Sequence, residues 1–278
     1  MSALYPLVRK RRAFSTRSGV RASPSRAGSS PSCSSSWRMR SCIGLFYIAL
    51  FALPLAAQAD PDALYRNRAT LDDARAAAAI WESRLRRDAR DFDAAWKLAR
   101  VLYWLGSHDA PQEVRRKALE RGIEAGRMAV AVHDARPEGH FWIAANMGAL
   151  AESFGLRQGL KYRGAIKREL EIVLKLDPKF QKGSADRALG RWYHKVPGLF
   201  GGSNRKSEEH LRRSLTYDAQ STVSHFFLAE TLFDMNRDAE AIEELKQVIA
   251  APYDPDWEPE DREYKRKAAE LLQQKQKR

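Results

Sequence analysis

Three cationic side chains stand four residues apart in one segment of the chain, Arg187, Arg191 and Lys195. If the segment is helical they share one face, where like charges repel unless an anion neutralises them. Guanidinium and ammonium groups placed in this way can bind a carboxylate through charge-assisted hydrogen bonds. The alternative is a solvated basic face that is paired with Glu208 or Glu209. The spacing therefore indicates either a site for an organic acid or peptide terminus, or a surface helix.

Nothing else in the sequence indicates reaction chemistry. No two of the 6 histidines stand four apart with a glutamate between them, and both cysteines, Cys33 and Cys42, lie in the first fifth of the chain. No GxSxG element, phosphate-binding loop or dinucleotide motif is present. The sequence predicts a protein that is not an enzyme, with no catalytic residue, no metal ligand and no cofactor.

The basic segment must be positioned by the stretch over 187–217, which predicts one helix, a corner over 196–203 that is rich in Pro and Gly, and a second helix. Leu189, Gly190 and Tyr193 have the spacing of a bulky residue, a small residue and an aromatic residue in the first helix of a tetratricopeptide (TPR) repeat. We expect the small residue at Gly190 to let the second helix pack closely.

The corner VPGLFGGSNRKS, the LGRWY before it and the LKLDPKF further upstream resemble the TatT family of periplasmic TPR proteins. TatT is the T component found with some tripartite ATP-independent periplasmic (TRAP) transporters. The similarity runs from about Gly139 to Pro252. The resemblance implies a helical-repeat protein that is exported across the inner membrane and assists a substrate-binding partner protein, and it implies no catalytic residues.

From Asp60 onward the apolar residues recur with helical periodicity, and no segment alternates as a strand does. The pattern predicts an all-α fold, a right-handed α-solenoid of about four stretched TPR-like helix pairs, with capping helices near 71–87 and 257–276. Equivalent positions in the four first helices, Trp96, Trp142, Asp186 and His225, are 46, 44 and 39 residues apart. Each spacing exceeds the roughly 34 residues of a standard TPR repeat.

Glycines mark the expected ends and contacts of these helices. Gly106 is expected to end the first helix of the first pair. The segment SFGLRQGLKYRG, residues 153–164, is expected to be an irregular connection of the kind on which function is often placed. Gly122 and Gly126 are expected to allow close helix packing in a soluble bundle.

If the pairs superpose on ordinary TPR repeats, their first helices line a concave groove that is apolar at one end and basic at the other. Such a groove suits a ligand with an apolar body and a carboxylate. The residues predicted to bind a ligand or partner are Lys97, Trp104, Ile143, Met147, Arg187, Arg191, His194, Lys195, Phe226 and Phe233.

The start of the chain has a different composition. Residues 1–38 predict a disordered or untranslated extension. Residues 39–59 have the basic start, short apolar run and Ala-Gln-Ala end of a secretory signal peptide. The alternatives are a retained anchor and an organellar leader, but the apolar run is shorter than the roughly 20 residues of a transmembrane helix. The helical-repeat domain is therefore expected to span 60–278, with no membrane span after cleavage.

The net charge belongs mainly to the same leading segment. Residues 1–59 hold nine of the 48 Lys and Arg residues and no Asp or Glu, which leaves 39 cations against 35 anions in the remainder. This small excess does not favour nucleic-acid binding.

These observations favour a non-enzymatic periplasmic TPR scaffold that binds a partner protein. By the resemblance, the partner is the substrate-binding component of a TRAP-type transporter, and the groove is expected to accept a carboxylate-bearing ligand. The alternative is a general cell-envelope assembly scaffold that is unrelated to transport. Formation of a homo-oligomer stays open.

We predict that the chain is exported and cleaved after Ala59, because an apolar run with a basic flank ends there in an A-x-A site. Mass spectrometry of the mature protein should find Asp60 as the first residue. A protein that begins at Met1 or Met39 and stays in the cytoplasm would contradict this prediction.

Overall fold

The computed structural model describes residues 59–277. The expected extension and signal peptide therefore lie outside the described residues, apart from Ala59. The described part contains helices and their connections and no strand, which confirms the expected all-α class. Its elements are α1 (Pro61–Arg66), α2 (Leu71–Arg87), α3 (Phe92–His108), α4 (Gln112–Val132), α5 (Pro137–Ser153), α6 (Leu156–Leu176), α7 (Ser184–Lys195), the short 3-10 helix η1 (Gly198–Phe200), α8 (Asn204–Tyr217), α9 (Thr222–Asp234), α10 (Asp238–Ala250) and α11 (Glu258–Gln276).

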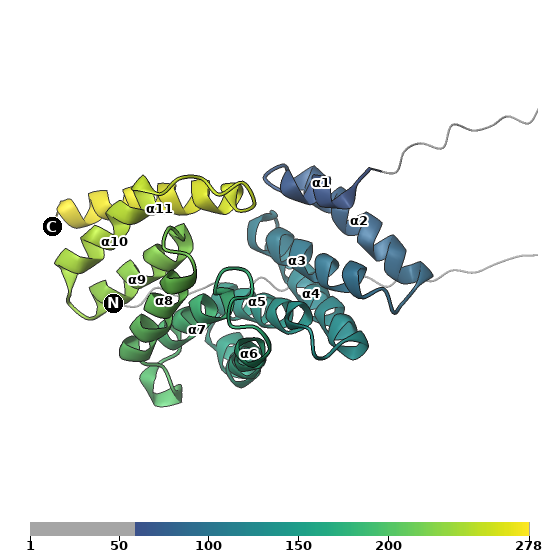
Figure 1. Ribbon diagram of the computed structural model, residues 1–278, viewed down its shortest axis with the longest axis horizontal. Coiled ribbons are helices and arrows are strands. Elements are labelled where there is room, and N and C mark those ends of the chain that lie inside the picture. Colours follow the sequence, from purple (N-terminus) through teal and green to yellow (C-terminus); the bar gives the residue numbers. More distant parts are fainter. Residues whose placement is uncertain (1–58, 278) are drawn as a thin grey trace, which may run out of the picture. The chain divides into compact units, whose positions relative to one another are not determined.

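Successive helices pack as pairs, α3 on α4, α5 on α6, α7 on α8 and α9 on α10. The first helices of neighbouring pairs also pack together, α3 with α5, and α7 with both α5 and α9. We call α3, α5, α7 and α9 the inner layer, and α4, α6, α8 and α10 the outer layer. Figure 1 shows the pairs following one another in sequence order, with α1 and α2 before the first pair and α11 after the last. This arrangement is the expected solenoid of four helix pairs with terminal helices.

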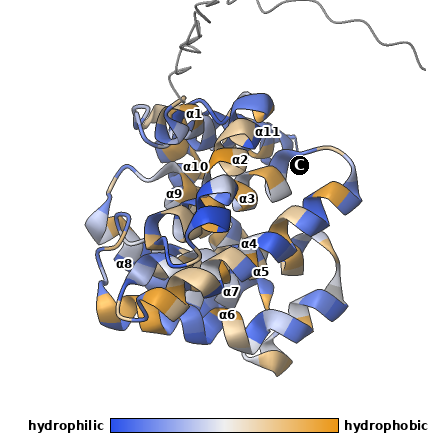
Figure 2. Cartoon of the chain, turned by 90° about the vertical axis from the view of Figure 1, so that its right-hand side faces the viewer, coloured by the Kyte–Doolittle hydropathy of each residue, from blue (hydrophilic) through white to orange (hydrophobic). Residues whose placement is uncertain are grey.

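Most of the helices carry both hydrophilic and hydrophobic residues, as the colours of Figure 2 show, whereas the inner helices α5 and α9 bury residues on most of their sides. The buried apolar residues form two clusters, one built from α1 to α7 and the other from α8 to α11. Short polar side chains begin several of the helices. The carboxylate of Asp91 accepts a hydrogen bond from the amide of Ala94, and the hydroxyl of Ser203 accepts one from the amide of Lys206. Ser203 therefore caps the helix after the corner.

Close packing at Gly190 is confirmed. A β-carbon on Gly190 would lie 2.5 Å from Cγ of Leu211, a fully buried residue of α8. Leu211 belongs to the second apolar cluster, whereas the neighbours of Gly190 on α7 belong to the first. The glycine therefore lets the two clusters meet where α7 crosses α8.

Two expectations about glycine are wrong. Helix α3 does not end at Gly106 but continues to His108, because Gly106 is a packing site that contacts Leu119 of α4. The segment over 153–164 is not an irregular connection, because α6 begins at Leu156 and contains most of it. Gly155, whose φ of 85° suits a glycine, makes the turn before α6.

The first terminal helix has a partner that the sequence did not reveal. Helix α1 is a single short helix with Pro61 in its first turn, and it packs against α2. The expected capping helix at 71–87 is present as α2 but is therefore not the first helix of the described chain.

Replacing Gly190 by Leu should lower the free energy of unfolding by about 1–3 kcal/mol, because the new side chain would overlap Leu211. Gly164→Leu is the matched control, since no atom lies within 4 Å of a β-carbon at Gly164 and the glycine in α6 costs helix stability. Thermal and urea unfolding should show a lower midpoint for the first variant and an equal or higher midpoint for the second. Equal midpoints for Gly190→Leu and the parent would mean that α7 and α8 are not packed as described.

Candidate functional site

The basic residues of α7 lie between acidic side chains of the neighbouring inner helices. Arg191 forms two hydrogen bonds with Glu152 of α5, at 3.1 and 2.9 Å, and pairs with Glu230 of α9 on its other side. Lys195 Nζ lies 3.4 Å from Glu230 Oε1, and His194 Nε2 lies 2.7 Å from Asp234 Oδ2. Three of the four basic residues predicted on α7 therefore have acidic partners on the inner layer.

These partners differ from the predicted ones. Glu208 pairs with Arg212 and Arg237, and Glu209 pairs with Arg213, all away from the α7 cations. The cause is geometric, because Glu208 and Glu209 lie on α8 in the outer layer, whereas the cations point along the inner layer toward α5 and α9.

The surroundings of these cations change their pKa values in opposite directions. Burial acts to lower the pKa of Arg191, but the carboxylates of Glu152 and Glu230 outweigh it and raise the pKa. Burial lowers the pKa of His194, against the opposing effect of its hydrogen bond to Asp234. Arg191 is thus a fixed cation, and His194 tends to the neutral form.

Arg187 is different, because it makes no ion pair within residues 59–277. Its guanidinium carbon lies 5.8 Å from the ring centre of Trp257, which precedes α11, in reach of a cation–π interaction. Burial is the main cause that lowers its pKa. Arg187 lines a pocket of about 20 Å³ together with Thr222 and Asp261. That volume holds roughly one water molecule.

The amino-terminal end of the predicted groove is covered by the chain itself. Lys97 Nζ lies 2.6 Å from Asp62 Oδ2 of α1. The indole nitrogen of Trp104 donates a 2.7 Å hydrogen bond to the carbonyl oxygen of Arg68, in the connection between α1 and α2. Both predicted binding residues are thus engaged by the first helices.

Helix α11 covers the other end. The ring of Phe226 lies 5.3 Å from the ring of Tyr264, centre to centre, and Phe226 is buried. Lys275 Nζ lies 3.9 Å from the ring centre of Phe233. Helix α11 also reaches α3, because His108 Nε2 lies 3.1 Å from Glu263 Oε2, so both ends of the predicted groove are covered by the chain itself.

Ile143 and Met147 do not lie on the inner face. A β-carbon on Gly126 of α4 would lie 2.6 Å from Ile143 Cγ1, so this face of α5 packs against the outer layer. Both residues are buried and form the floor of a groove between α4 and α6. The expected close packing at Gly122 and Gly126 is confirmed, and it fixes the rotation of α5.

A feature that sequence reasoning missed joins the two ends of the described chain. Arg68 is 2% exposed, and its Nε lies 3.1 Å from Glu260 Oε1 of α11. Its Nη2 donates a 2.9 Å hydrogen bond to the carbonyl oxygen of Asp256. Burial raises the pKa of Glu260, against the lowering effect of Arg68. No motif in the sequence marks Arg68 among the many other arginines.

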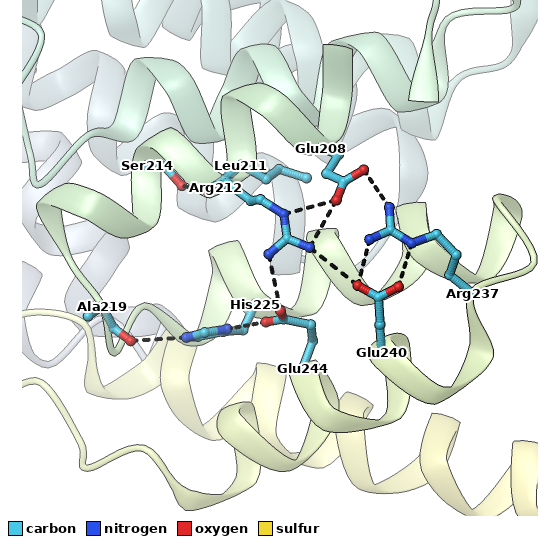
Figure 3. A network of polar contacts seen from close by, with 9 residues as sticks. All are labelled: Glu208, Leu211, Arg212, Ser214, Ala219, His225, Arg237, Glu240 and Glu244. Atoms are coloured by element: carbon cyan, nitrogen blue, oxygen red, sulfur yellow. Dashed lines mark hydrogen bonds and ion pairs between the residues drawn. The ribbon is translucent and has the colours of Figure 1, made fainter. Parts of the chain in front are cut away.

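Two histidines of the inner layer, His140 and His225, contact carboxylates of the outer layer. His140 contacts Glu169 of α6 at 2.7 Å and the carbonyl oxygen of Asp134 at 2.9 Å. His225 contacts Glu244 of α10 at 2.5 Å and the carbonyl oxygen of Ala219 at 3.0 Å, as Figure 3 shows. Burial acts to lower the pKa of His225, but these two partners raise it overall.

The described residues offer neither a metal site nor a membrane span. Between residues 59 and 277, no group of three or more His, Cys, Asp or Glu is placed to hold a metal ion. Within the same range, no helix has the length and hydropathy that crossing a membrane requires.

The architecture is that of TPR proteins. It is similar to the crystal structure of TTC0263, a thermophilic TPR protein in Thermus thermophilus, at 20% identity and a TM-score of 0.57, covering 76% of this chain and 97% of that one. It also matches the crystal structure of MamA at 15% identity and a TM-score of 0.45, covering 72% and 95%. No curated protein matches the chain. The similarity to TTC0263 thus shows the fold of a helical-repeat protein.

Two family models match as well. The family described as TRAP transporter T-component matches residues 130–278, and that described as regulator of microtubule dynamics protein 1-3 matches residues 58–200. Each match spans at least half of the chain, so the chain belongs to the TRAP transporter T-component family and, over its earlier part, to the other family also.

The ion pairs of Arg191 predict that replacing this residue mainly lowers stability. Arg191→Gln should lower the free energy of unfolding by about 1–3 kcal/mol, because Glu152 and Glu230 lose their shared partner. Lys195→Gln is the control and should cost less than about 1 kcal/mol, since Lys195 makes a single longer contact near solvent. Urea unfolding measures both, and equal losses would show that Arg191 does not hold the inner helices together.

Proposed function

We propose that the chain is a non-enzymatic periplasmic scaffold that binds the substrate-binding subunit of a TRAP-type transporter. The observation that carries the proposal is the TRAP transporter T-component match over residues 130–278, which includes α7 and its corner. The periplasmic location rests on this family and on the signal peptide expected at 39–59. Stacked helix pairs offer extended rigid surfaces of the kind that bind proteins.

The partner surface that we assign is the carboxyl end of α7 with the corner after it. Leu199, in η1, is 90% exposed, which is far more than any other large apolar residue of the described chain. Two backbone hydrogen bonds brace the corner, from the amide of Gly202 to the carbonyl of Pro197 and from the amide of Ser203 to the carbonyl of Tyr193. An exposed leucine on a braced backbone loses little freedom on binding and suits a pocket in a partner.

The charged middle of the inner face borders this corner. Lys195 ends α7 directly before it, and its partner Glu230 also contacts Arg191. Because these charges are already paired, the face can meet a protein surface without burying an uncompensated ion.

We propose Arg187 alone as the residue that would bind a carboxylate-bearing ligand. This side chain has the donors that suit a carboxylate and has no acidic partner among the described residues. Its pocket of about 20 Å³, which Asp254 and Asp261 also line, has room for roughly one water molecule, so a carboxylate ligand would have to approach Arg187 from outside this pocket.

The test is calorimetric titration of the exported chain with the TRAP substrate-binding subunit encoded in the same genome. We expect a complex that Leu199→Ser weakens roughly tenfold or more, because an apolar anchor is lost. Leu176→Ser is the control, a partly exposed leucine at the end of α6, and should leave the affinity unchanged. Absence of a complex would favour the general envelope scaffold, and equal effects of both leucine variants would place the interface elsewhere.

A further inference from the structure

Side chains bridge three of the junctions between neighbouring outer helices. If α2 is counted with the outer layer, these are α2 with α4, α6 with α8, and α8 with α10. Arg121 of α4 pairs with Glu82 of α2 at 3.1 Å. Arg237, which directly precedes α10, pairs with Glu208 of α8 at 2.7 Å, in the network that Figure 3 shows. Between α6 and α8, the ring of Tyr193 lies under two ammonium groups. Those groups belong to Lys167 of α6, at 5.4 Å, and Lys206 of α8, at 5.5 Å.

The junction between α4 and α6 is not bridged. No hydrogen bond or ion pair joins these two helices within the described chain. Instead they enclose a groove of about 360 Å³ whose floor is α5. Its apolar lining consists of Val130, Ala131, Ile143, Met147, Ala165 and Ile172. A groove of this volume with a largely apolar lining is within the size range of ligand-binding clefts.

The groove carries unmatched positive charge. Arg127 lies on its α4 side and Arg168 on its α6 side, both are exposed, and neither makes an ion pair in the part of the chain that the structure describes. The acidic residue of the lining, Glu169, is held by His140 at 2.7 Å. Two guanidinium groups on opposite rims are therefore free to receive anions from outside.

We infer that the groove between α4 and α6 is a docking site for an acidic amphipathic segment of a partner protein. Apolar side chains of that segment would cover the floor at Ile143 and Met147, and its carboxylates would pair with Arg127 and Arg168. The walls are long enough, because helices of 21 residues each extend for roughly 30 Å.

The charge pattern excludes the leading segment of the chain as the occupant. Residues 1–58 contain nine Lys and Arg and no Asp or Glu, so they would be repelled by Arg127 and Arg168. The site lies on the outer layer, away from the α7 corner, and does not depend on the identity of the transporter partner.

The test uses the exported chain and a fluorescent helical peptide of about 18 residues with leucines on one face and glutamates along both edges of that face. We expect binding by fluorescence anisotropy, and at least roughly tenfold weaker binding of a peptide in which every Glu is Gln. The double variant Arg127→Glu with Arg168→Glu should lose at least as much affinity for the acidic peptide.

Lys117→Glu with Arg205→Glu is the matched control. It makes the same change in net charge at two exposed cations that do not line the groove, so the affinity should stay within about twofold. Ala165→Trp tests the apolar lining of the groove. A large ring at this half-buried position would fill the groove, so the affinity for the peptide should fall by roughly tenfold or more. Circular dichroism and urea unfolding of each variant separate loss of binding from loss of fold.

Several results would overturn the inference. A Kd for the acidic peptide weaker than about 1 mM, or equal effects of the two double variants, would show that the groove does not recognise acidic segments. If dodecanoate binds and the acidic peptide does not, the Met147 methyl resonance should shift with dodecanoate alone. The occupant of the groove would then be a free amphiphile. If the chain self-associates, and only the Arg127→Glu with Arg168→Glu variant loses this self-association, the occupant of the groove is a second copy of the chain.

Discussion

A buried guanidinium holds the two ends of the repeat domain together. Arg68 lies in the connection after α1, and its partners Glu260 and the carbonyl of Asp256 lie at the start of α11. Removing both charges from water is costly, and the pair is favourable only when its remaining hydrogen bonds are satisfied. Trp104 supplies a further contact by donating to the Arg68 carbonyl. This closure brings the terminal helices across the inner layer and so decides which part of that layer can reach a partner.

The stacking of the repeats between these ends depends on paired charges as well as on apolar packing. Arg191 joins α5 to α9 through Glu152 and Glu230, so one side chain of α7 links three inner helices. The histidine contacts join inner to outer helices at matching places in the second and fourth pairs, each with one carboxylate and one carbonyl six residues earlier. The spacing between repeats varies, but the same polar contacts fix α5 and α9 against their outer helices.

The sequence predicts local structure well and the open surface poorly. Gly190 could be recognised because a small residue between Leu189 and Tyr193 has one simple explanation, close approach of the next helix. Ile143 and Met147 could not be placed, since their face depends on Gly126 in another helix. Nor could Lys97 and Phe226 be recognised as covered, because the short α1 and the closure at Arg68 are long-range features. The spacing of four in Arg187, Arg191 and Lys195 is real, but the acidic partners of Arg191 and Lys195 come from helices about 40 residues away.

The two proposed surfaces differ in how their charges are balanced, and this gives them different selectivity. At the α7 end, Lys195 and Arg191 already have carboxylate partners, so an incoming protein gains mainly from the exposed Leu199 and from shape. In the outer groove, Arg127 and Arg168 have no internal partner among the described residues, so an occupant gains from charge as well as from apolar contact. Salt therefore weakens binding in the outer groove far more than binding at the α7 end. On these two proposals, one scaffold can bind two partners by independent interactions. One partner would supply an apolar pocket for Leu199, and the other would supply acidic side chains for Arg127 and Arg168.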